Sequence, residues 1–347
     1  MKKRLRVLHL LQSDKFSGAE NVVCEIIQMF RDTEIEMAYS SQDGSIRNVL
    51  KRRNINFLPM NSISISEIRR VVKEFKPDVI HAHDFTASIL SSITVSCPII
   101  SHLHNNPPWI KTYGLKSWGF LASYSKYKKI LTVSDAILDE YVFNKKIKKK
   151  TVMIGNPINM DEIKKKALEP ISKKENYDFV FLGRLVTQKN PIRFIKIVKE
   201  LCERLPHIKV AMIGDGELRQ ECEELIVELN LVNTITLLGF MENPYPILCN
   251  SKLLCMTSDW EGFGLVAVEA MILGRPVVCT YVGGLKEIVN NECGMHCSSN
   301  LEFCDEIYEL LTDNTYREFK SNNALSRAMI LENISSYRTT LNNIYLE

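Results

Sequence analysis

The chain lacks the loop motifs that would assign a common cofactor directly. No segment reads G-x-G-x-x-G, and the nearest, "GDGELR" at 214–219, lacks the third glycine. No G-x-x-x-x-G-K-[ST] segment occurs either. Dinucleotide-dependent oxidoreductases and P-loop NTPases therefore both lose their main sequence support.

Long apolar runs and paired cysteines are also missing. No stretch of 18 apolar residues occurs, so the sequence predicts no membrane-spanning helix. The first residues, "MKKRLRVLHLLQS", imitate a secretion signal, but Arg6 and His9 interrupt the apolar part, and a first β-strand fits better. The ten cysteines form no C-x-x-C pair, which favours free thiols in a reducing, cytosolic compartment.

Charge is distributed unevenly along the chain, although the net charge is only +3. Residues 1–170 hold 27 Lys and Arg against 17 Asp and Glu, a net charge of +10. The remaining residues hold 17 against 24, a net charge of −7. We therefore expect the two halves to face different partners, the basic half meeting a phospholipid surface, a lipid diphosphate or nucleic acid.

Short apolar runs alternate with amphipathic segments, which predicts an α/β fold with parallel sheets covered by helices. The 347 residues suffice for two domains, and a lysine-rich polar stretch, "DEIKKKALEPISKKEN", separates two such patterns. We expect four segments: an N-terminal Rossmann-like domain over 1–160, a linker over 161–176, a C-terminal Rossmann-like domain over 177–330, and a helix over 331–347 that is a candidate to pack back on the first domain.

The loop "DWEGFG" at 259–264 joins a predicted buried strand to a predicted helix. Ligands of parallel sheets bind where strands end and helices begin, so this loop is a candidate site. Gly264 removes a side chain where an anion would approach the backbone, and the amides of Leu265 and Val266 open the helix towards that anion.

Glu269 is the only charge in the apolar run that follows this loop. It could simply favour the positive end of the helix dipole. That alternative does not explain the apolar neighbours, because a buried carboxylate requires hydrogen-bond donors. A ribose would supply two adjacent hydroxyls.

Two more strand-to-helix loops carry suitable chemistry. In "KFSGAEN", Gly18 lets the backbone approach a ligand, although it could be an ordinary turn glycine. In "LGRLVTQKNP", Arg184 and Lys189 could converge on one anion, although both could be exposed surface cations.

Histidines occur in two alternating pairs, His81 with His83 and His102 with His104. Alternate residues on a strand face the same side, so each pair could chelate a metal. Alternatively, one member of each pair lines a cleft and the other packs. We favour His104 as a functional residue and expect no metal site.

Together these residues resemble the retaining, nucleotide-sugar-dependent glycosyltransferases of family 4, which have the GT-B fold. The match is densest over "EGFGLVAVEAMILGRPVV" and "VGGLKEIV", which include the E-x7-E signature. It is strong over 178–290 and weaker over 1–150, where members of the family diverge because their acceptors differ. The resemblance implies two Rossmann-like domains whose parallel sheets face a central cleft.

The resemblance also implies roles for the polar residues. Arg184 and Lys189 would grip the donor diphosphate, and Glu269 would bind the ribose hydroxyls. Glu261 would hydrogen-bond the transferred sugar, and His104 would lie beside the sugar and the acceptor. No metal or cofactor would be required, because the cations and the helix amides neutralise the diphosphate.

Backbone contacts complete the implied donor site. The backbone at Gly264, Leu265 and Val266 would contact the phosphates, and Gly18 would reach the diphosphate from the other domain. Met241 would lie where the base is held.

The function implied is a hexosyltransferase that moves a hexose or N-acetylhexosamine from a nucleotide-diphosphate sugar, with UDP-sugars first, to a glycan or lipid-linked acceptor in surface polysaccharide or glycoconjugate synthesis. Aromatic residues and lysines mix over 107–130, and a basic run follows at 144–150, which suits a membrane interface. We therefore expect a cytoplasmic enzyme, peripheral on the inner face of the cell membrane. A core-packed helix with solvated lysines is the alternative.

Two other functions stay open on the sequence. One is a nucleotide-sugar epimerase of the same fold. The other is a non-catalytic nucleotide-sugar-binding or nucleic-acid-binding protein, and the absence of a recognisable nucleic-acid motif argues against nucleic acid as a partner.

Overall fold

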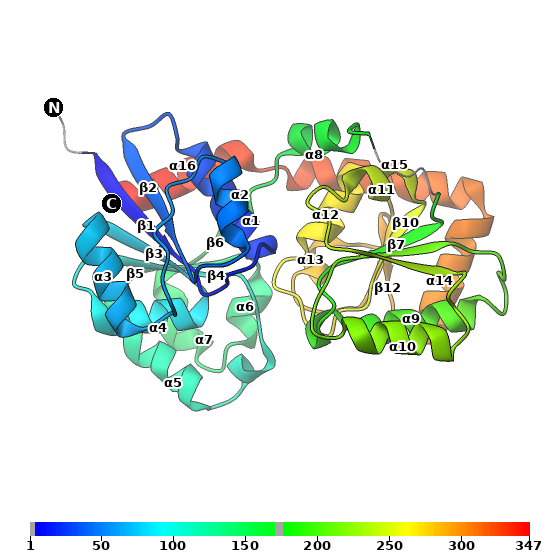
Figure 1. The fold of residues 1–347 in the computed structure, drawn as a ribbon, viewed down its shortest axis with the longest axis horizontal. Coiled ribbons are helices and arrows are strands. Elements are labelled where there is room, and N and C mark those ends of the chain that lie inside the picture. The colour runs from blue at the N-terminus through cyan, green and yellow to red at the C-terminus, as the bar shows by residue number, and fades with distance from the viewer. Residues whose placement is uncertain (1–3, 171–175) are drawn as a thin grey trace. The chain divides into compact units, whose positions relative to one another are not determined.

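The computed structural model describes residues 4–170 and 176–347, which form two compact units (Figure 1). The first unit comprises Met1–Pro157 and Asn333–Glu347, and the second comprises Ile158–Glu332. Each unit contains one six-stranded parallel sheet with helices on both faces. The predicted α/β class with two Rossmann-like sheets is confirmed.

The sheet of the first unit has the order β2-β1-β3-β4-β5-β6. Every residue of β3 and β4 is buried, because helices cover both faces of a parallel sheet. The strands are β1 (Leu5–Leu10), β2 (Ile35–Ser40), β3 (Val79–His83), β4 (Ile99–Leu103), β5 (Tyr127–Thr132) and β6 (Thr151–Met153).

Helices from both ends of the chain surround this sheet. They are α1 (Gly18–Met29), α2 (Ile46–Arg52), α3 (Ile65–Phe75), α4 (Asp84–Thr94), α5 (Leu115–Ala122), α6 (Asp135–Glu140), α7 (Asn144–Ile147) and α16 (Ile334–Leu346), with the short 3-10 helices η1 (Pro108–Lys111), η2 (Ser123–Lys126) and η3 (Lys148–Lys150). The Tyr345 ring of α16 meets the Phe30 ring edge-on at 5.7 Å, so the last helix belongs to the core of the first unit.

The sheet of the second unit has the order β12-β11-β10-β7-β8-β9. Its strands are β7 (Phe179–Leu182), β8 (Val210–Ile213), β9 (Ile235–Gly239), β10 (Leu253–Met256), β11 (Val277–Cys279) and β12 (Gly294–His296). The chain runs outwards in one direction from β7 to β9 and in the other from β10 to β12. The strand order therefore reverses between β7 and β10, which is where open α/β sheets bind ligands.

The helices of the second unit cover two separate apolar clusters. They are α8 (Met160–Ala167), α9 (Pro191–Leu201), α10 (Arg219–Glu228), α11 (Tyr245–Asn250), α12 (Leu265–Ile272), α13 (Leu285–Ile288), α14 (Asn300–Thr312) and α15 (Asn314–Leu331), with the 3-10 helix η4 (Thr187–Lys189). Val180 of β7 packs into the cluster containing α12, and its neighbours Phe179 and Phe181 pack into the cluster containing α9. Central β7 thus supports both layers.

The expected linker over 161–176 begins as a helix. Asn159 caps α8 by accepting a hydrogen bond from the Glu162 amide, and Met160 is buried in the core of the second unit. The lysines of α8 lie on its last turn, where cations suit the helix dipole. Residues 171–175 of the expected linker lie outside the described residues.

All ten cysteines are free thiols. Across the described residues, no helix has both the length and the apolar character of a membrane span.

Candidate active site

Close backbone packing shapes the loop between β10 and α12. Gly264 has a φ of 100°, and a Cβ there would lie 2.7 Å from Leu285 Cδ2. A Cβ on Gly284 would lie 2.5 Å from the carbonyl oxygen of Phe263, and the Gly284 amide donates to the Glu261 carbonyl at 3.1 Å. Glycine is required at both positions. The hydrogen bond from the Gly284 amide fixes the position of the Glu261 backbone.

Gly264→Ala is expected to lower the free energy of unfolding by about 1–3 kcal/mol, because alanine disfavours a positive φ and its Cβ would strike Leu285. Urea unfolding measures the change. Gly183→Ala is the control in the same unit, since a Cβ there meets Lys189 carbons no closer than 3.6 Å. Equal stability of the two variants would contradict the assigned backbone strain.

Lys189 and Glu261 meet at the reversal of the strand order. Lys189 ends η4 after β7, Glu261 follows the adjacent β10, and the Nζ of Lys189 forms an ion pair with a Glu261 carboxylate oxygen. The two side chains are only 14% and 11% exposed. The Ser258 hydroxyl donates to the same carboxylate oxygen at 3.3 Å. Removing either partner would leave a largely buried charge without its counter-ion.

Arg184 reaches the same loop through a residue that the sequence did not single out. Its guanidinium donates to Gln188 Oε1 at 3.2 Å, and Gln188 Nε2 donates to the Trp260 carbonyl at 3.1 Å. The structure therefore brings Arg184, Lys189 and Glu261 to one edge of the second sheet. No local sequence motif identifies Gln188, because its partner lies on another loop.

Asn190 and Thr257 join the two loops. Asn190 has a φ of 48° and caps α9, its Oδ1 accepting from the Arg193 amide at 3.1 Å. Its Nδ2 donates to Asp259 Oδ1 at 3.0 Å. The Thr257 hydroxyl lies 3.1 Å from the Lys189 carbonyl and 2.9 Å from that of Asn190. The "NP" pair before an amphipathic segment could have identified this cap.

Glu269 lies half-buried on α12, with one side-chain donor in place among the described residues. The Tyr245 hydroxyl of α11 donates to its Oε1 at 3.1 Å. Burial raises the pKa of Glu269 to about 7, and the Tyr245 hydrogen bond and the Lys166 charge oppose this shift only in part. The carboxyl group can therefore accept from further hydroxyl donors. Tyr245 was missed, because "NPYPIL" carries no recognisable signal.

The residues predicted to contact the donor through their backbone lie on the second unit, apart from Gly18. Leu265 and Val266 are the first residues of α12, and first-turn amides have no acceptor within their own helix. Met241 follows β9 and packs, like Val266 and Tyr245, against the core cluster of α12.

His104 and Gly18 belong to the first unit. His104 follows β4, and its amide donates to Asp84 Oδ1 at 2.9 Å. Asp84 has a φ of 66°, a strained value of the kind found at functional sites. Burial lowers the pKa of His104 to about 3, so its ring is neutral at pH 7.

Gly18 is the first residue of α1. The hydroxyl of the preceding Ser17 donates to the buried Glu20 carboxylate, three residues further on. Ser17 is therefore engaged within the helix start, and the first amides of α1 have no acceptor within their own helix.

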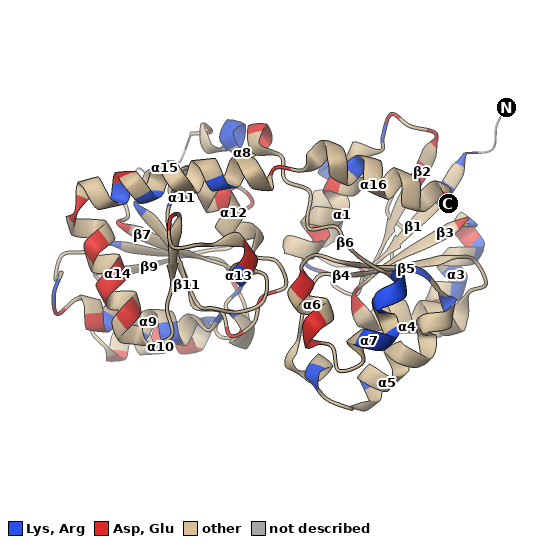
Figure 2. Cartoon of the chain, turned by 180° about the vertical axis from the view of Figure 1, so that it is seen from behind, with Lys and Arg blue, Asp and Glu red and all other residues tan. Residues whose placement is uncertain are grey.

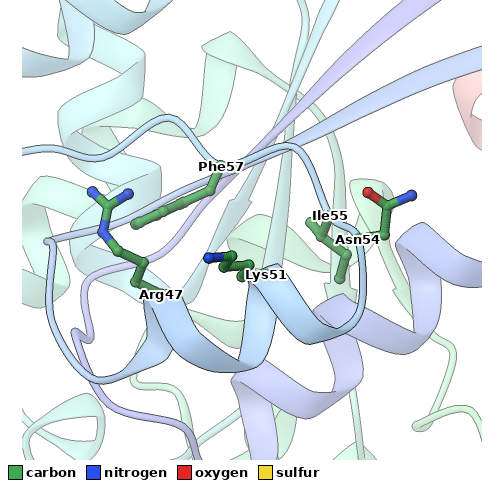
Figure 3. A pocket seen from close by; sticks show the side chains of 5 residues that line it. All are labelled: Arg47, Lys51, Asn54, Ile55 and Phe57. Atoms are coloured by element: carbon green, nitrogen blue, oxygen red, sulfur yellow. The ribbon is translucent and has the colours of Figure 1, made fainter.

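A pocket of about 370 Å³ lies elsewhere on the first unit (Figure 3). It is lined by Arg47, Lys51, Asn54, Ile55 and Phe57. None of these was predicted as a site residue, and Arg47 is neutralised by two hydrogen bonds to Asp43, at 2.8 and 2.7 Å.

Both halves of the chain match known families. Residues 16–162 match Glycosyltransferase Family 4, and residues 159–327 match Glycosyl transferases group 1. An uncharacterized glycosyltransferase of Methanocaldococcus jannaschii is 30% identical over 276 residues, covering 73% of this chain and 68% of that protein.

Two relatives carry more specific names. The GalNAc-alpha-(1->4)-GalNAc-alpha-(1->3)-diNAcBac-PP-undecaprenol alpha-1,4-N-acetyl-D-galactosaminyltransferase of Campylobacter jejuni is 30% identical over 277 residues, covering 76% of this chain and 74% of that protein. The UDP-Gal:alpha-D-GlcNAc-diphosphoundecaprenol alpha-1,3-galactosyltransferase of Escherichia coli is 25% identical over 330 residues, covering 83% and 82%.

Solved structures share the fold. Anabaena HepE in complex with UDP-glucose superposes with a TM-score of 0.84 at 20% identity, covering 98% of each chain. A glycosyltransferase from Rickettsia africae gives 0.75 at 18% identity, covering 99% of this chain and 98% of that chain. Two matched families in tandem, relatives at 30% identity and two parallel Rossmann-like sheets identify this chain as a GT-B glycosyltransferase that belongs to the group 1 and family 4 glycosyltransferases.

Proposed function

We propose that this glycosyltransferase is a retaining hexosyltransferase that moves a hexose or N-acetylhexosamine from a UDP-sugar to a hydroxyl of a lipid-linked glycan. The single observation that carries the proposal is the Lys189–Glu261 pair at the strand reversal of the second unit. Support comes from the undecaprenol-linked acceptors in two relatives' names and from the UDP-glucose complex of HepE.

The diphosphate of the donor binds to Arg184, Lys189 and the first amides of α12. These fixed donors stabilise the negative charge that grows on the leaving diphosphate, and each is worth roughly 10²–10³ in rate. When the diphosphate engages Lys189, the Glu261 carboxylate becomes available to accept hydrogen bonds from the transferred sugar. The ion pair thus holds both groups in position before the donor binds.

The nucleoside occupies the neighbouring part of the same unit. Glu269 accepts hydrogen bonds from the two ribose hydroxyls, with Tyr245 holding one carboxylate oxygen. The base lies at Met241, where backbone contacts hold it. These donors and acceptors bind the donor without a metal.

The acceptor hydroxyl attacks from the face that the diphosphate leaves. The bond between the anomeric carbon and the phosphate oxygen breaks, the bond to the acceptor oxygen forms, and a phosphate oxygen takes the acceptor proton. Configuration is retained without a covalent intermediate, because the new bond forms on the face of the sugar that the diphosphate leaves, while Glu261 orients the sugar and does not attack it. The acceptor binds to the first unit, which carries His104.

A donor panel tests this function. UDP-linked glucose, galactose and their N-acetylamino forms, with GDP-mannose for comparison, are each incubated with an undecaprenyl-diphosphate-linked glycan. We expect a labelled lipid product and UDP release that depends on the acceptor. Donor consumption without acceptor, with a changed sugar, would indicate the epimerase instead.

We also propose that the first unit binds an anionic membrane. Tyr113, Leu115 and Trp118 are 71%, 92% and 52% exposed. The Tyr113 and Trp118 rings lie 5.4 and 4.5 Å from the ring of Phe143, which is the N-cap residue of α7. Helix α7 carries Lys145 and Lys146 and is blue in Figure 2. Aromatic and basic side chains therefore adjoin, as in proteins that bind at a bilayer interface. By contrast, Phe120 is buried, so part of the aromatic segment is core.

Lys145→Ala with Lys146→Ala is expected to weaken binding to phosphatidylglycerol vesicles roughly 30-fold, at about 1 kcal/mol per lysine. Vesicle flotation at low and high salt measures this. Lys164→Ala with Lys165→Ala removes the same charge from the exposed side of α8 and is the control. Absence of salt-sensitive binding by the wild type would refute the membrane proposal.

A further inference from the structure

Five of the seven histidines form one buried cluster in the first unit. His9 lies on β1, His81 and His83 on β3, and His102 on β4, while His104 directly follows β4. These three strands are neighbours in the sheet (Figure 1), with His9 opposite His81 and His83 opposite His102. The rings of His102 and His104 lie 4.1 Å apart.

Hydrogen bonds divide the cluster into two chains. In the first, His9 Nδ1 lies 3.0 Å from His83 Nε2, and His83 Nδ1 lies 2.8 Å from His104 Nε2. In the second, the Tyr345 hydroxyl lies 2.7 Å from His81 Nδ1, and His81 Nε2 lies 3.2 Å from His102 Nδ1. Among the described residues, the end nitrogens of the first chain, His9 Nε2 and His104 Nδ1, are buried without a partner.

The protons of the first chain are linked. Burial lowers the pKa of His9 and His104 to about 3 and that of His83 well below its usual value, so each ring carries one proton at pH 7. A neutral imidazole donates from one nitrogen and accepts at the other. If His83 donates from Nδ1, then His104 accepts at Nε2 and carries its proton on Nδ1. If His83 donates from Nε2, His104 instead presents a lone pair at Nδ1.

The two arrangements differ in where they leave an N–H group. The second places it on His9 Nε2, in a side chain that is 0% exposed and has no acceptor among the described residues. The first leaves only a lone pair there and places the N–H on His104 Nδ1, which is itself buried but belongs to a partly exposed side chain, so it is the end of this hydrogen-bond chain that water or a ligand oxygen can approach. Buried N–H groups without a partner are costly, so the first arrangement is favoured.

We propose that His83 is a positioning residue that holds His104 as the Nδ1–H tautomer, which makes His104 a hydrogen-bond donor towards substrate rather than a proton acceptor. The role at the substrate rests on the proposed function, but the tautomer does not. A metal ion fits the His9–His83–His104 hydrogen-bond chain less well, because the hydrogen bonds to His9 and His104 already occupy both ring nitrogens of His83. Two histidine triads nevertheless have possible ligand atoms within 4.8 Å of one another, so the experiment must include a metal.

Nitrogen-15 NMR of the full chain with labelled histidine rings tests the proposal, with His104 assigned from the spectrum of His104→Ala. We expect a protonated Nδ1 and a bare Nε2 on His104 in the ligand-free wild type at pH 7.5. His83→Phe preserves an aromatic ring in the stack but removes both hydrogen bonds. It is expected to return His104 to the Nε2–H tautomer and to lower kcat roughly 10- to 100-fold, with UDP affinity unchanged.

Two variants separate tautomer control from packing. His83→Asn keeps an amide donor near the Nδ1 position and is expected to restore the Nδ1–H tautomer. His102→Phe alters a ring 4.1 Å from His104 whose own hydrogen bond goes to His81, so the tautomer of His104 should not change.

The outcomes are distinct. An Nε2–H tautomer in the wild type, or an unchanged tautomer in His83→Phe, would overturn the proposal. So would stoichiometric binding of added Zn²⁺ that shifts the resonances of the whole cluster. The expected tautomer in a protein that transfers no sugar would support the inference and count against the proposed function.

Discussion

Glu261→Gln is expected to lower kcat roughly 10²- to 10³-fold while leaving the Kd for UDP within about three-fold of the wild-type value. The amide preserves the shape of the side chain but loses the charge that orients the transferred sugar, and UDP lacks this transferred sugar, so Glu261 has nothing to contact in it. Steady-state transfer kinetics and calorimetry of UDP binding measure the two quantities.

Lys189→Ala should both lower kcat and raise the Kd for UDP, because it removes a diphosphate ligand and leaves Glu261 without its counter-ion. The control is Lys252→Ala. Lys252 pairs with Asp178 at 2.9 Å, beside the beginnings of β10 and β7, at the opposite edge of the same sheet. Near-normal turnover by both Glu261→Gln and Lys189→Ala would refute the proposed arrangement.

Glu269→Gln is expected to weaken UDP binding roughly 10- to 100-fold, since hydrogen bonds to a charged acceptor contribute about 1.5–3 kcal/mol. In the wild type, UDP affinity should rise as the pH increases through about 7, because the ribose hydroxyls bind the ionised carboxylate. The variant should lose this rise. A UDP affinity that is independent of pH between 6 and 8 in the wild type would exclude Glu269 as the ribose ligand.

The free energy of unfolding of the unliganded protein should change with pH in the opposite direction and fall as the pH rises. The pKa of Glu269 is raised from 4.5 to about 7 on folding, so the folded state binds more protons than the unfolded state between these values. Its contribution to stability is therefore present at low pH and is lost as the pH rises through about 7. Urea unfolding of the wild type and Glu269→Gln at pH 5 and 8 isolates this contribution.

Strand positions were predictable where apolar runs are short and bounded by turns. The run "KVAMIG", for example, matches β8 closely. The apolar run "NFLPM" at 56–60 equally predicts a strand, but that prediction is wrong, because the structure shows only isolated bridges at Phe57 and Met60. Pro59 explains the difference, since proline has no amide to donate to a ladder.

The polar site was predictable only in part. An isolated charge predicted Lys189 in a strand-to-helix loop and Glu269 in an apolar run, because each stands out against its local pattern, and the family resemblance added Glu261. Gln188 and Tyr245 could not be identified in this way. Their roles depend on which loops become neighbours, and strand order is a property of the whole sheet.

The histidines show the same limit. The alternation of His81 with His83, and of His102 with His104, predicted shared faces. It did not predict that His9, more than 70 residues earlier, is hydrogen-bonded to His83, which in turn is hydrogen-bonded to His104. That contact arises because β1 and β3 pair in parallel with His9 opposite His81.

The central claim is that two carboxylates bind different parts of the donor. Glu269 of α12 binds the ribose, and Glu261 of the loop between β10 and α12 binds the transferred sugar. Calorimetric titration of UDP into the wild type, Glu261→Gln and Glu269→Gln tests it most directly. We expect the Kd of Glu269→Gln to rise at least 10-fold and that of Glu261→Gln to stay within about three-fold. Equal weakening in both variants, or weakening in Glu261→Gln alone, would contradict the claim.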